Sequence, residues 1–480
     1  MDLVKNMKNK LVKSFLEFSV GNIATLLLGL ISSPIITRLI LPDEFGKFSM
    51  FTTVTSLIQI VLLLGFDQSY VRFYYEEDEE NRSVLLMRCI KIPMLINIGI
   101  SLLLFLLYKP ISNFILGEYS IFIIIMIIFN NTFYIFNKFS LLLIRMKQKG
   151  KQYSALQIAS KLIYILVIVC VFKLFKSDYR TLVVAIVISN LIVAIIAIFI
   201  EKKTWFKKLR GTKVKVSNKQ IFDFGFPLIF STAVIWIFQS IDKVFIKEFS
   251  GYLELGLYSS AFYIISLLNT LQGAFTTFWI PVANKKYKEG NSEEFFIKIN
   301  NLVSMVLIIL GALVITFKDL IIMFLGSNYN GAAYIFPFLV FMPIMYTISE
   351  TTVIGINFKV KSKYHLIIAI ISSVVNIIGN YLFIPSMGAK GAAISTGISY
   401  IVFFVLRTHF AQKLYYIRYN LKKIYISLIP LFVLALYSSF NKIDIKIIIL
   451  GLACTILDLL LYKNTVIEVI NEIFKEKRKK

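Results

Sequence analysis

The sequence predicts an all-α integral membrane protein with about fourteen transmembrane helices, arranged as two six-helix bundles plus a C-terminal helix pair. Three observations lead to this fold class. The chain has 480 residues and is 58% hydrophobic, which is too apolar for a water-soluble globular domain. Its apolar residues gather into segments of about 20, the length that a tilted helix needs to cross a bilayer. Its basic residues fall mainly in every second connection between these segments.

The first apolar segment follows a short basic stretch, as it would in a signal peptide. The apolar run is too long for such a peptide and has no convincing small-residue cleavage site, so we expect it to remain as the first helix. The predicted spans are 18–40, 48–68, 89–108, 118–142, 155–175, 181–200, 222–247, 256–281, 300–317, 332–355, 365–385, 391–412, 424–440 and 444–462.

The distribution of basic residues predicts the orientation of the chain. Of the 52 Lys and Arg residues, 40 lie in the N-terminus, every second connection and the C-terminus, and 12 lie in the other connections. Because basic residues are retained on the cytoplasmic side, both termini are predicted to be cytoplasmic and the number of spans to be even. The net charge of +25 is therefore expected to face anionic lipid head groups, not nucleic acid.

Motifs of enzymes and metal sites are absent from the sequence. It has no GxxxxGK[ST] phosphate loop, no GxSxG elbow and no HExxH pair, and its two histidines are isolated. Cys89, Cys170 and Cys454 lie inside predicted spans without CxxC spacing, so neither a disulfide framework nor a zinc site is expected. The longest connection, 201–221, leaves no room for a catalytic domain. We therefore expect a protein that is not an enzyme and that holds no metal or cofactor.

Short motifs indicate an internal repeat. EFS at 17–19 resembles DFG at 223–225, and FGKFS at 45–49 resembles LGLYS at 255–259. Membrane proteins with duplicated bundles are most simply transporters, with a substrate site between the halves. The predicted division is an N-terminal six-helix bundle at 1–200, a basic cytoplasmic linker at 201–221, a second six-helix bundle at 222–412, and helices thirteen and fourteen with a basic cytoplasmic tail at 413–480.

Further landmark motifs occur in order along the chain. They are RLILPDEFGKFS at 38–49, GFDQSYVRFY at 65–74, FGFP at 224–227 with Asp242, GLYSSA at 256–261, and Asn376 and Pro385 before GAKGAA at 388–393. Together these motifs resemble the first helix pair, the seventh and eighth helices and the eleventh-to-twelfth hairpin of the polysaccharide transporter family. That family contains the Wzx-type flippases for O-antigen and capsule repeat units.

This resemblance implies a fold and a function. The implied fold is that of the multidrug, oligosaccharidyl-lipid and polysaccharide exporter superfamily, with alternating access between two bundles. The implied activity is outward movement of undecaprenyl-pyrophosphate-linked oligosaccharides across the bacterial cytoplasmic (inner) membrane, for O-antigen, capsule or exopolysaccharide synthesis. The expected partners are this polyprenyl-pyrophosphate-linked glycan, membrane lipids, a polysaccharide polymerase and a chain-length regulator. A proton or sodium gradient is the expected driving force.

Other functions stay open at this level. A cation-coupled multidrug exporter shares the implied fold, but cationic drugs favour acidic cavities and this chain offers several basic candidates. A lipid II flippase for peptidoglycan also fits fourteen spans. A membrane-bound glycan polymerase or ligase would be an enzyme and would usually need a large outer loop, whereas the outer connections here are short.

Charged residues in or beside spans are costly and are therefore functional candidates. A pyrophosphate needs cations, and the planar fork of arginine suits phosphate oxygens. The basic candidates for contact with it are Arg38, Arg72, Arg145, Lys161 and Lys243. Snorkelling to head groups is the alternative role for Arg145 and Lys161. For Arg72 the alternative is a structural ion pair with Asp67, Glu76 or Glu77.

Three acidic residues are candidates for coupling or gating, namely Asp67, Asp242 and Glu350. Asp242 could pair with Lys243 or, across helices, with Arg38. Glu350 lies near the middle of the tenth predicted span, with no basic residue within one helical turn. An unpaired carboxylate in hydrocarbon favours its protonated form. We therefore expect Glu350 either to exchange a proton or sodium ion or to be a neutral acid bonded to a neighbour.

Overall fold

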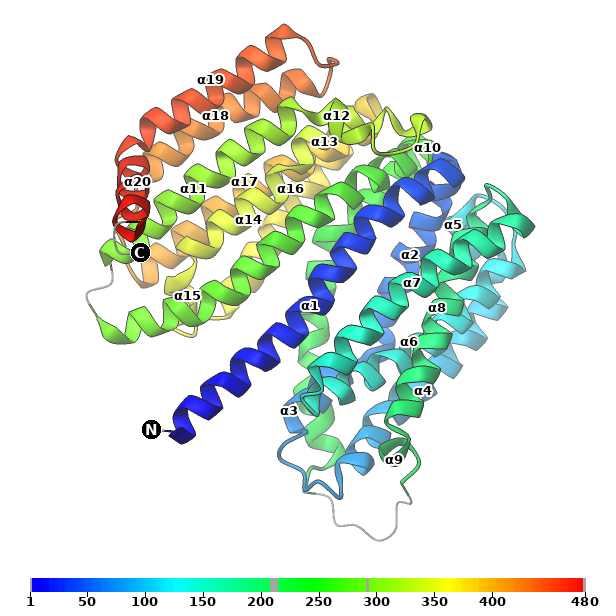
Figure 1. Cartoon of the computed structure of the whole chain (residues 1–480). Helices are drawn as coiled ribbons and strands as arrows, with labels where there is room; N and C mark the ends of the chain where they lie inside the picture. The colour runs from blue at the N-terminus through cyan, green and yellow to red at the C-terminus, as the bar shows by residue number, and fades with distance from the viewer. Residues whose placement is uncertain (1, 208–214, 291–292, 478–480) are drawn as a thin grey trace. The chain divides into compact units, whose positions relative to one another are not determined.

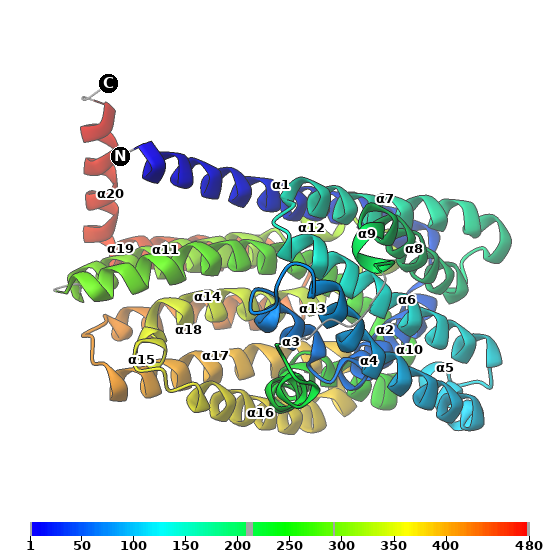
Figure 2. The same cartoon turned by 90° about the horizontal axis from the view of Figure 1, so that it is seen from below.

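All regular structure that the computed structural model describes, in residues 2–207, 215–290 and 293–477, is helical (Figure 1, Figure 2). The predicted all-α class is confirmed. Helices satisfy their own backbone hydrogen bonds, which is why so apolar a chain adopts them in a bilayer. The chain divides into two compact units, Met1–Trp236 and Ile237–Lys480, and each is described by itself.

The first unit is built from long helices joined by short connections and short helices. α1 packs along α7, α7 packs along α8, and α6 contacts both α8 and α4. Its helices are α1 (Asp2–Leu39), α2 (Pro42–Leu63), α3 (Phe66–Phe73), α4 (Arg82–Leu106), α5 (Tyr108–Leu116), α6 (Ile121–Met146), α7 (Gly150–Phe175), α8 (Tyr179–Ile200), α9 (Lys202–Trp205) and the start of α10 (Asn218–Glu289).

The first landmark motif, at 38–49, contains the start of α2, and the second, at 65–74, begins just after its end. Pro42 stands in the first turn, where its missing N–H is no loss, and Asp43 and Glu44 follow near the positive end of the helix dipole. At the other end Leu64 adopts a left-handed conformation, with φ 44°, and Gly65 follows with φ 71°. The chain then turns into α3, so the first motif sets the start of α2 and the second sets the turn and the start of α3.

The start of α10 is fixed to the first unit by side chains that bond its backbone. The Ser69 hydroxyl donates to the carbonyl oxygen of Ile221 at 2.7 Å, and the Glu77 carboxylate accepts from the backbone N–H of Val216 at 2.7 Å. Gly225 faces Gly65 so closely that a Cβ atom at Gly225 would lie 2.7 Å from the Gly65 carbonyl oxygen. The glycine in the DFG motif is therefore required by close approach of two backbones.

The second unit contains the rest of α10 and the C-terminal helices. α17 packs against α16 and α14, while α11 contacts α14, α18 and α19. The remaining helices are α11 (Glu293–Thr316), α12 (Lys318–Ile322), η1 (Ser327–Tyr329), α13 (Ala332–Leu339), α14 (Phe341–Thr352), α15 (Ile354–Phe358), α16 (Lys363–Met387), α17 (Ala389–Leu414), α18 (Leu421–Ser438), α19 (Ile445–Leu461) and α20 (Lys463–Lys477).

The motifs of the predicted repeat place two glutamates in matching positions with matching contacts. Glu44 precedes FGKFS and accepts from the backbone N–H of Tyr179 at 2.9 Å, at the start of α8. Glu254 precedes LGLYS and accepts from the backbone N–H of Ala389 at 3.0 Å, at the start of α17. In each unit a carboxylate thus meets the positive end of a helix dipole.

The length and apolarity of the helices give a smaller number of spans than the sequence predicted. Among the described residues, 11 helices are long and apolar enough to cross a membrane. The number is 12 if the pair Ile445–Leu461 and Lys463–Asn471, bent by 73°, counts as one span. α10 carries both the seventh and eighth predicted spans, joined at Gly251, whose φ of 83° and ψ of −175° suit glycine. The apolar part of α1, Ile23–Leu39, is shorter than the 18 residues that a span needs. The number fourteen is therefore not confirmed.

The predicted division at 200, 221 and 412 stays a prediction. Residues 208–214 of the predicted linker and 478–480 of the predicted tail lie outside the described residues.

Candidate functional site

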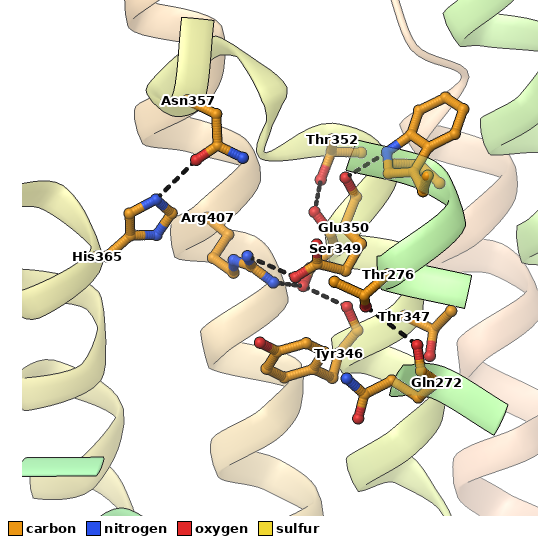
Figure 3. Close-up of polar contacts among 12 residues, drawn as sticks. Gln272, Thr276, Tyr346, Thr347, Ser349, Glu350, Thr352, Asn357, His365 and Arg407 are labelled. Atoms are coloured by element: carbon orange, nitrogen blue, oxygen red, sulfur yellow. Dashed lines mark hydrogen bonds and ion pairs between the residues drawn. The ribbon is translucent and has the colours of Figure 1, made fainter. Parts of the chain in front are cut away.

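A buried ion pair joins α14 and α17 in the second unit (Figure 3). The Arg407 guanidinium donates to the Glu350 carboxylate at 2.8 Å and to the Ser349 hydroxyl at 2.6 Å. Only 5% of Arg407 and 4% of Glu350 is exposed. In so dry a setting each charge depends on the other, because either one alone would carry a large desolvation cost.

Aromatic rings enclose this pair. The Arg407 guanidinium lies 5.0 Å from the ring centre of Tyr346 and 5.1 Å from that of Phe403. The Trp279 indole N–H donates to the backbone carbonyl oxygen of Glu350 at 3.0 Å, which ties α10 to α14. The rings stabilise the cation through their faces, and they fix the direction of its planar fork.

The sequence-based premise that Glu350 is unpaired is wrong. Its partner is 57 residues away in the chain and reaches it because α17 packs against α14. The charges within one turn of Glu350 on its own helix do not include Arg407. The sequence of that helix therefore does not reveal this contact. The coupling role assigned to Glu350 stays a prediction.

Polar contacts continue from the pair toward the turn after α14. The hydroxyls of Thr352 and Thr408 are 2.7 Å apart and link α14 to α17. The His365 ring nitrogen lies 2.9 Å from the Asn357 side-chain oxygen, which links α16 to α15 (Figure 3). A layer of polar groups thus extends from the buried ion pair to the end of these helices.

A second buried carboxylate, Asp242, lies among donors from three other parts of the second unit. It accepts from the Tyr258 hydroxyl at 2.7 Å, the Thr396 hydroxyl at 2.6 Å and the Asn380 amide at 2.5 Å. Asp242 is 2% exposed, and its oxygens are occupied by these neutral donors and not by Lys243. A hydrogen-bonded network thus takes the place of the local pair with Lys243, which is one of the two pairings that the sequence allows for Asp242.

Neutral oxygens gather around Asp242. The Asn380 amide also donates to the Asn376 side-chain oxygen at 3.2 Å, and the Asn380 side-chain oxygen is buried without a hydrogen bond in the part of the chain that the structure describes. No group of three or more His, Cys, Asp or Glu residues in that part could hold a metal ion. One carboxylate with amide and hydroxyl oxygens is suited to a proton or a small monovalent cation.

In the first unit Asp67 and Arg72 have different partners. The Asp67 carboxylate lies 3.6 Å from the ammonium of Lys138 on α6, and Arg72 bonds Glu76 at 2.5 Å. The structural ion pair expected as one role for Arg72 is present, with Glu76 as its acid. Asp67 is 7% exposed, whereas 34% of the Lys138 side chain is exposed, so the pair is partly buried.

The other basic candidates are spread over separate helices. Arg38 and Arg145 are exposed at the ends of α1 and α6. Lys161 on α7 is half-buried, with its ammonium 5.5 Å from the Tyr164 ring centre. Lys243 is half-buried on α10. The structure does not gather these residues around a shared acidic partner within the described ranges, and their contact with substrate stays a prediction.

Arg407 and Lys138 were missed at the sequence level although both lie inside predicted spans. Arg407 stands five residues before the end of the predicted span 391–412, and Lys138 four residues before the end of 118–142. Both lie near a span end that is followed by further basic residues, which gives them the pattern of interfacial charges. Their position inside apolar spans is the signal in the sequence that marks them as functional candidates.

Comparison with known proteins agrees with this architecture. Residues 11–287 match the family described as "Polysaccharide biosynthesis protein". An uncharacterized membrane protein of Haemophilus influenzae is 22% identical over 82% of this chain and 92% of its own length. The capsular polysaccharide biosynthesis protein CapF of Staphylococcus aureus is 21% identical over 84% of this chain and 100% of its own length.

Solved structures show the same fold. The lipid II flippase MurJ in an inward closed conformation aligns with a TM-score of 0.71 and 17% identity, covering 95% of this chain and 99% of MurJ. An inward-facing multidrug resistance MATE family transporter of the MOP superfamily aligns with a TM-score of 0.58 and 15% identity, covering 83% and 97%. The chain therefore has the fold that these two solved structures share.

Proposed function

Because this chain belongs to the polysaccharide biosynthesis protein family, we propose that it moves a lipid-linked oligosaccharide repeat unit across the membrane. The chain is a membrane protein with a MOP transporter fold and not an enzyme. The observation that carries the proposal is the family match over residues 11–287, on a chain of which 95% aligns with a solved structure of that fold. The proposed substrate is an undecaprenyl-pyrophosphate-linked glycan destined for O-antigen, capsule or exopolysaccharide.

The ion pair of Arg407 and Glu350 supports a specific step within this proposal, in which Arg407 exchanges the Glu350 carboxylate for the pyrophosphate. Protonation of Glu350 would remove the negative charge that holds the Arg407 guanidinium. The guanidinium of Arg407, once free of Glu350, could then bind an anionic oxygen of the pyrophosphate, because its planar geometry suits phosphate oxygens. Proton uptake at Glu350 would in this way be coupled to substrate contact at Arg407. A proton gradient is then the driving force.

Asp242 is the proposed site of a coupling cation. A proton or sodium ion there would compete with the donors from Tyr258, Asn380 and Thr396 and so change how α10, α16 and α17 are held together. The pairing of Asp67 with Lys138 is a proposed gating contact of the first unit. Arg38, Arg72, Arg145, Lys161 and Lys243 remain proposed contacts for the pyrophosphate.

The test is a deletion strain complemented with variants of this protein. Polyprenyl-linked oligosaccharides are extracted and quantified together with the surface polymer. We expect the deletion to accumulate repeat units and lose polymer. Arg407→Gln and Glu350→Gln should each fail to restore polymer when the amount of the variant in the membrane is matched to that of the parent. Lys359→Gln, which removes an exposed charge from the same unit, should restore it fully.

Other outcomes would favour other transporters. Normal repeat units and polymer with increased drug sensitivity would contradict the proposal and favour a multidrug exporter. Accumulation of lipid II with arrested peptidoglycan synthesis would favour a lipid II flippase, the activity for which the structurally similar MurJ is named. If Glu350→Gln leaves transport and its pH dependence unchanged, the proposed proton exchange is wrong.

A further inference from the structure

The first unit has a polar cavity of about 800 Å³ where α3, α6 and α8 lead into their following turns. Its volume is in the range of small-molecule sites, which is about 300–1,000 Å³. Five basic side chains and one acidic side chain line it. The basic side chains are those of Arg82, Lys147, Lys149, Lys203 and Lys207, and the acidic one is that of Glu79. Figure 1 shows α3, α9 and the start of α4 at the same end of this unit.

One wall of the cavity holds an arginine in a fixed orientation. The Arg82 guanidinium donates from its Nε atom to the Tyr74 carbonyl oxygen at 3.1 Å and lies over the rings of Tyr74 and Tyr75, 4.7 and 5.4 Å from their centres. The Tyr75 hydroxyl in turn donates to the Met146 carbonyl oxygen at 2.5 Å. An arginine has five N–H donors, so these contacts leave donors for an anion.

Another part of the cavity wall holds two lysines that share one carboxylate. Lys147 and Lys149 both bond Glu201, which is 3% exposed, and Lys147 also donates to the Thr204 hydroxyl at 2.6 Å. Burial raises the pKa of Glu201, but its hydrogen bonds and charge contacts with the two lysines outweigh this, so the pKa lies below its usual value. Glu201 therefore stays ionised near neutral pH. Two cations sharing one anion leave a positive charge uncompensated.

Within the part of the chain that the structure describes, the two remaining cations, Lys203 and Lys207, form no ion pair. Lys203 has no ion pair or hydrogen bond within the described residues, and the Lys207 ammonium donates to the neutral Glu80 carbonyl oxygen at 3.0 Å. Glu79 contacts Arg82 at 3.4 Å but is 87% exposed at its side chain, so water and salt weaken its charge. The cavity thus carries an excess of positive charge and suits an anion with more than one oxygen.

Apolar side chains beside the cavity indicate that this anion belongs to a lipid. Phe199 and Phe206 are 69% and 76% exposed; Phe199 precedes Lys203 by four residues and Phe206 directly precedes Lys207. Exposed aromatic residues next to basic residues at helix ends are typical of the membrane interface. A soluble phosphate would need the cations but not these rings.

We propose that this cavity binds the phosphate-bearing head group of an anionic phospholipid, in the leaflet at this end of the first unit. Arg82 and the lysines contact the phosphate, while Phe199 and Phe206 lie among the acyl chains. Basic pockets at helix ends bind anionic lipid head groups through such charge complementarity. The site is independent of the transported substrate, so it can fail while the proposed function stands.

The test measures lipid binding to the purified full-length protein by mass spectrometry of the intact complex. Phosphatidylglycerol is titrated against phosphatidylcholine, and inorganic pyrophosphate is added as a soluble competitor. The variant is Lys203→Gln with Lys207→Gln. The matched control is Lys359→Gln with Lys361→Gln, which removes the same charge from exposed positions predicted to lie on the same membrane face. Fluorescence of the buried Trp205 and elution as a single species check that each variant is folded.

We expect one phosphatidylglycerol to bind more tightly than phosphatidylcholine. The cavity variant should weaken its binding about thirtyfold, the effect of two cations near a lipid surface, and the control variant less than twofold. Equal binding of the two lipids, or equal loss in the cavity and control variants, would overturn the proposal. Full displacement by pyrophosphate, together with pyrophosphate binding in the absence of lipid, would identify a soluble phosphate as the ligand and would also overturn it.

Discussion

Arg407 and Glu350 lie too deep in the second unit for either charge to persist alone. Each is almost fully buried, and among the described residues the guanidinium contacts the carboxylate, the Ser349 hydroxyl and two aromatic faces. Breaking a buried pair leaves one charge uncompensated, whereas replacing both partners removes that penalty. The pair is therefore expected to behave as a unit in mutagenesis.

Arg407→Gln alone should destabilise the protein by about 3–5 kcal/mol, because it leaves Glu350 charged or forces its protonation. Arg407→Gln combined with Glu350→Gln should recover a large part of this loss. Thermal unfolding of the solubilised protein measures both effects. Lys285→Gln, which removes one partner of an exposed pair with Glu289 on α10, is the control and should change little. Additive losses in the double variant would contradict the expected coupling.

Asp242 accepts three hydrogen bonds, and this makes it sensitive to a nearly isosteric change. Asp242→Asn would turn one acceptor into an N–H₂ donor that faces the donors of Tyr258, Asn380 and Thr396. An unsatisfied buried polar group costs about 1–3 kcal/mol, so we expect a loss of stability of that size. Thermal unfolding compared with the exposed Lys288→Gln measures it. An Asp242→Asn protein as stable as the parent would show that the network is not maintained.

At the scale of elements, the connections between helices are as specific as the helices themselves. Glu44 and Glu254 each bond the first backbone N–H of a helix far along the chain, and the start of α10 is bonded by side chains of α3 and the following turn. Such contacts fix where a long apolar helix begins, which its apolar surface alone cannot do, because that surface packs equally well at neighbouring registers.

Two glycines of α10 provide a matched comparison. A Cβ atom at Gly225 would collide with the Gly65 backbone, whereas a Cβ atom at Gly273 would meet nothing within 4 Å. Gly225→Ala should therefore lower the folded yield and the unfolding temperature. Gly273→Ala should be neutral or slightly stabilising, by up to about 1 kcal/mol, because alanine favours helix. Similar losses in both variants would show that the close approach at Gly225 is not decisive.

The contact of Glu201 with Lys147 and Lys149 predicts a pH dependence. Because the pKa of Glu201 is lowered in the folded state from 4.5, its contribution to stability is fully present above the unfolded value. It is lost as the pH falls through the folded value. The difference in unfolding temperature between the parent and Glu201→Gln should thus be largest near pH 7 and shrink as the pH falls below about 4.5. A constant difference from pH 7 to pH 4 would contradict this origin.

At the scale of the whole molecule, the alternation of basic residues predicts the side on which each connection lies. Lys109 and Lys361 are both exposed, and they belong to connections that this rule assigns to opposite sides. In a background with Cys170→Ser, Lys109→Cys should react with a membrane-impermeant thiol reagent in intact cells, and Lys361→Cys only after the membrane is opened. The reverse labelling would invert the predicted orientation, and labelling of both would contradict the parity of spans between them.

The sequence by itself determined the helical class and the position of most helices, because apolar segments of bilayer length have no other stable structure in lipid. Its landmark motifs determined the family. It also located Asp242 and Glu350, since a carboxylate in an apolar segment is conspicuous in one dimension. Only the tertiary structure decided their partners, because Arg407, Thr396 and Asn380 lie on helices that meet them only after packing. Which charges are paired depends on distances between helices, and the sequence of a single helix does not contain those distances.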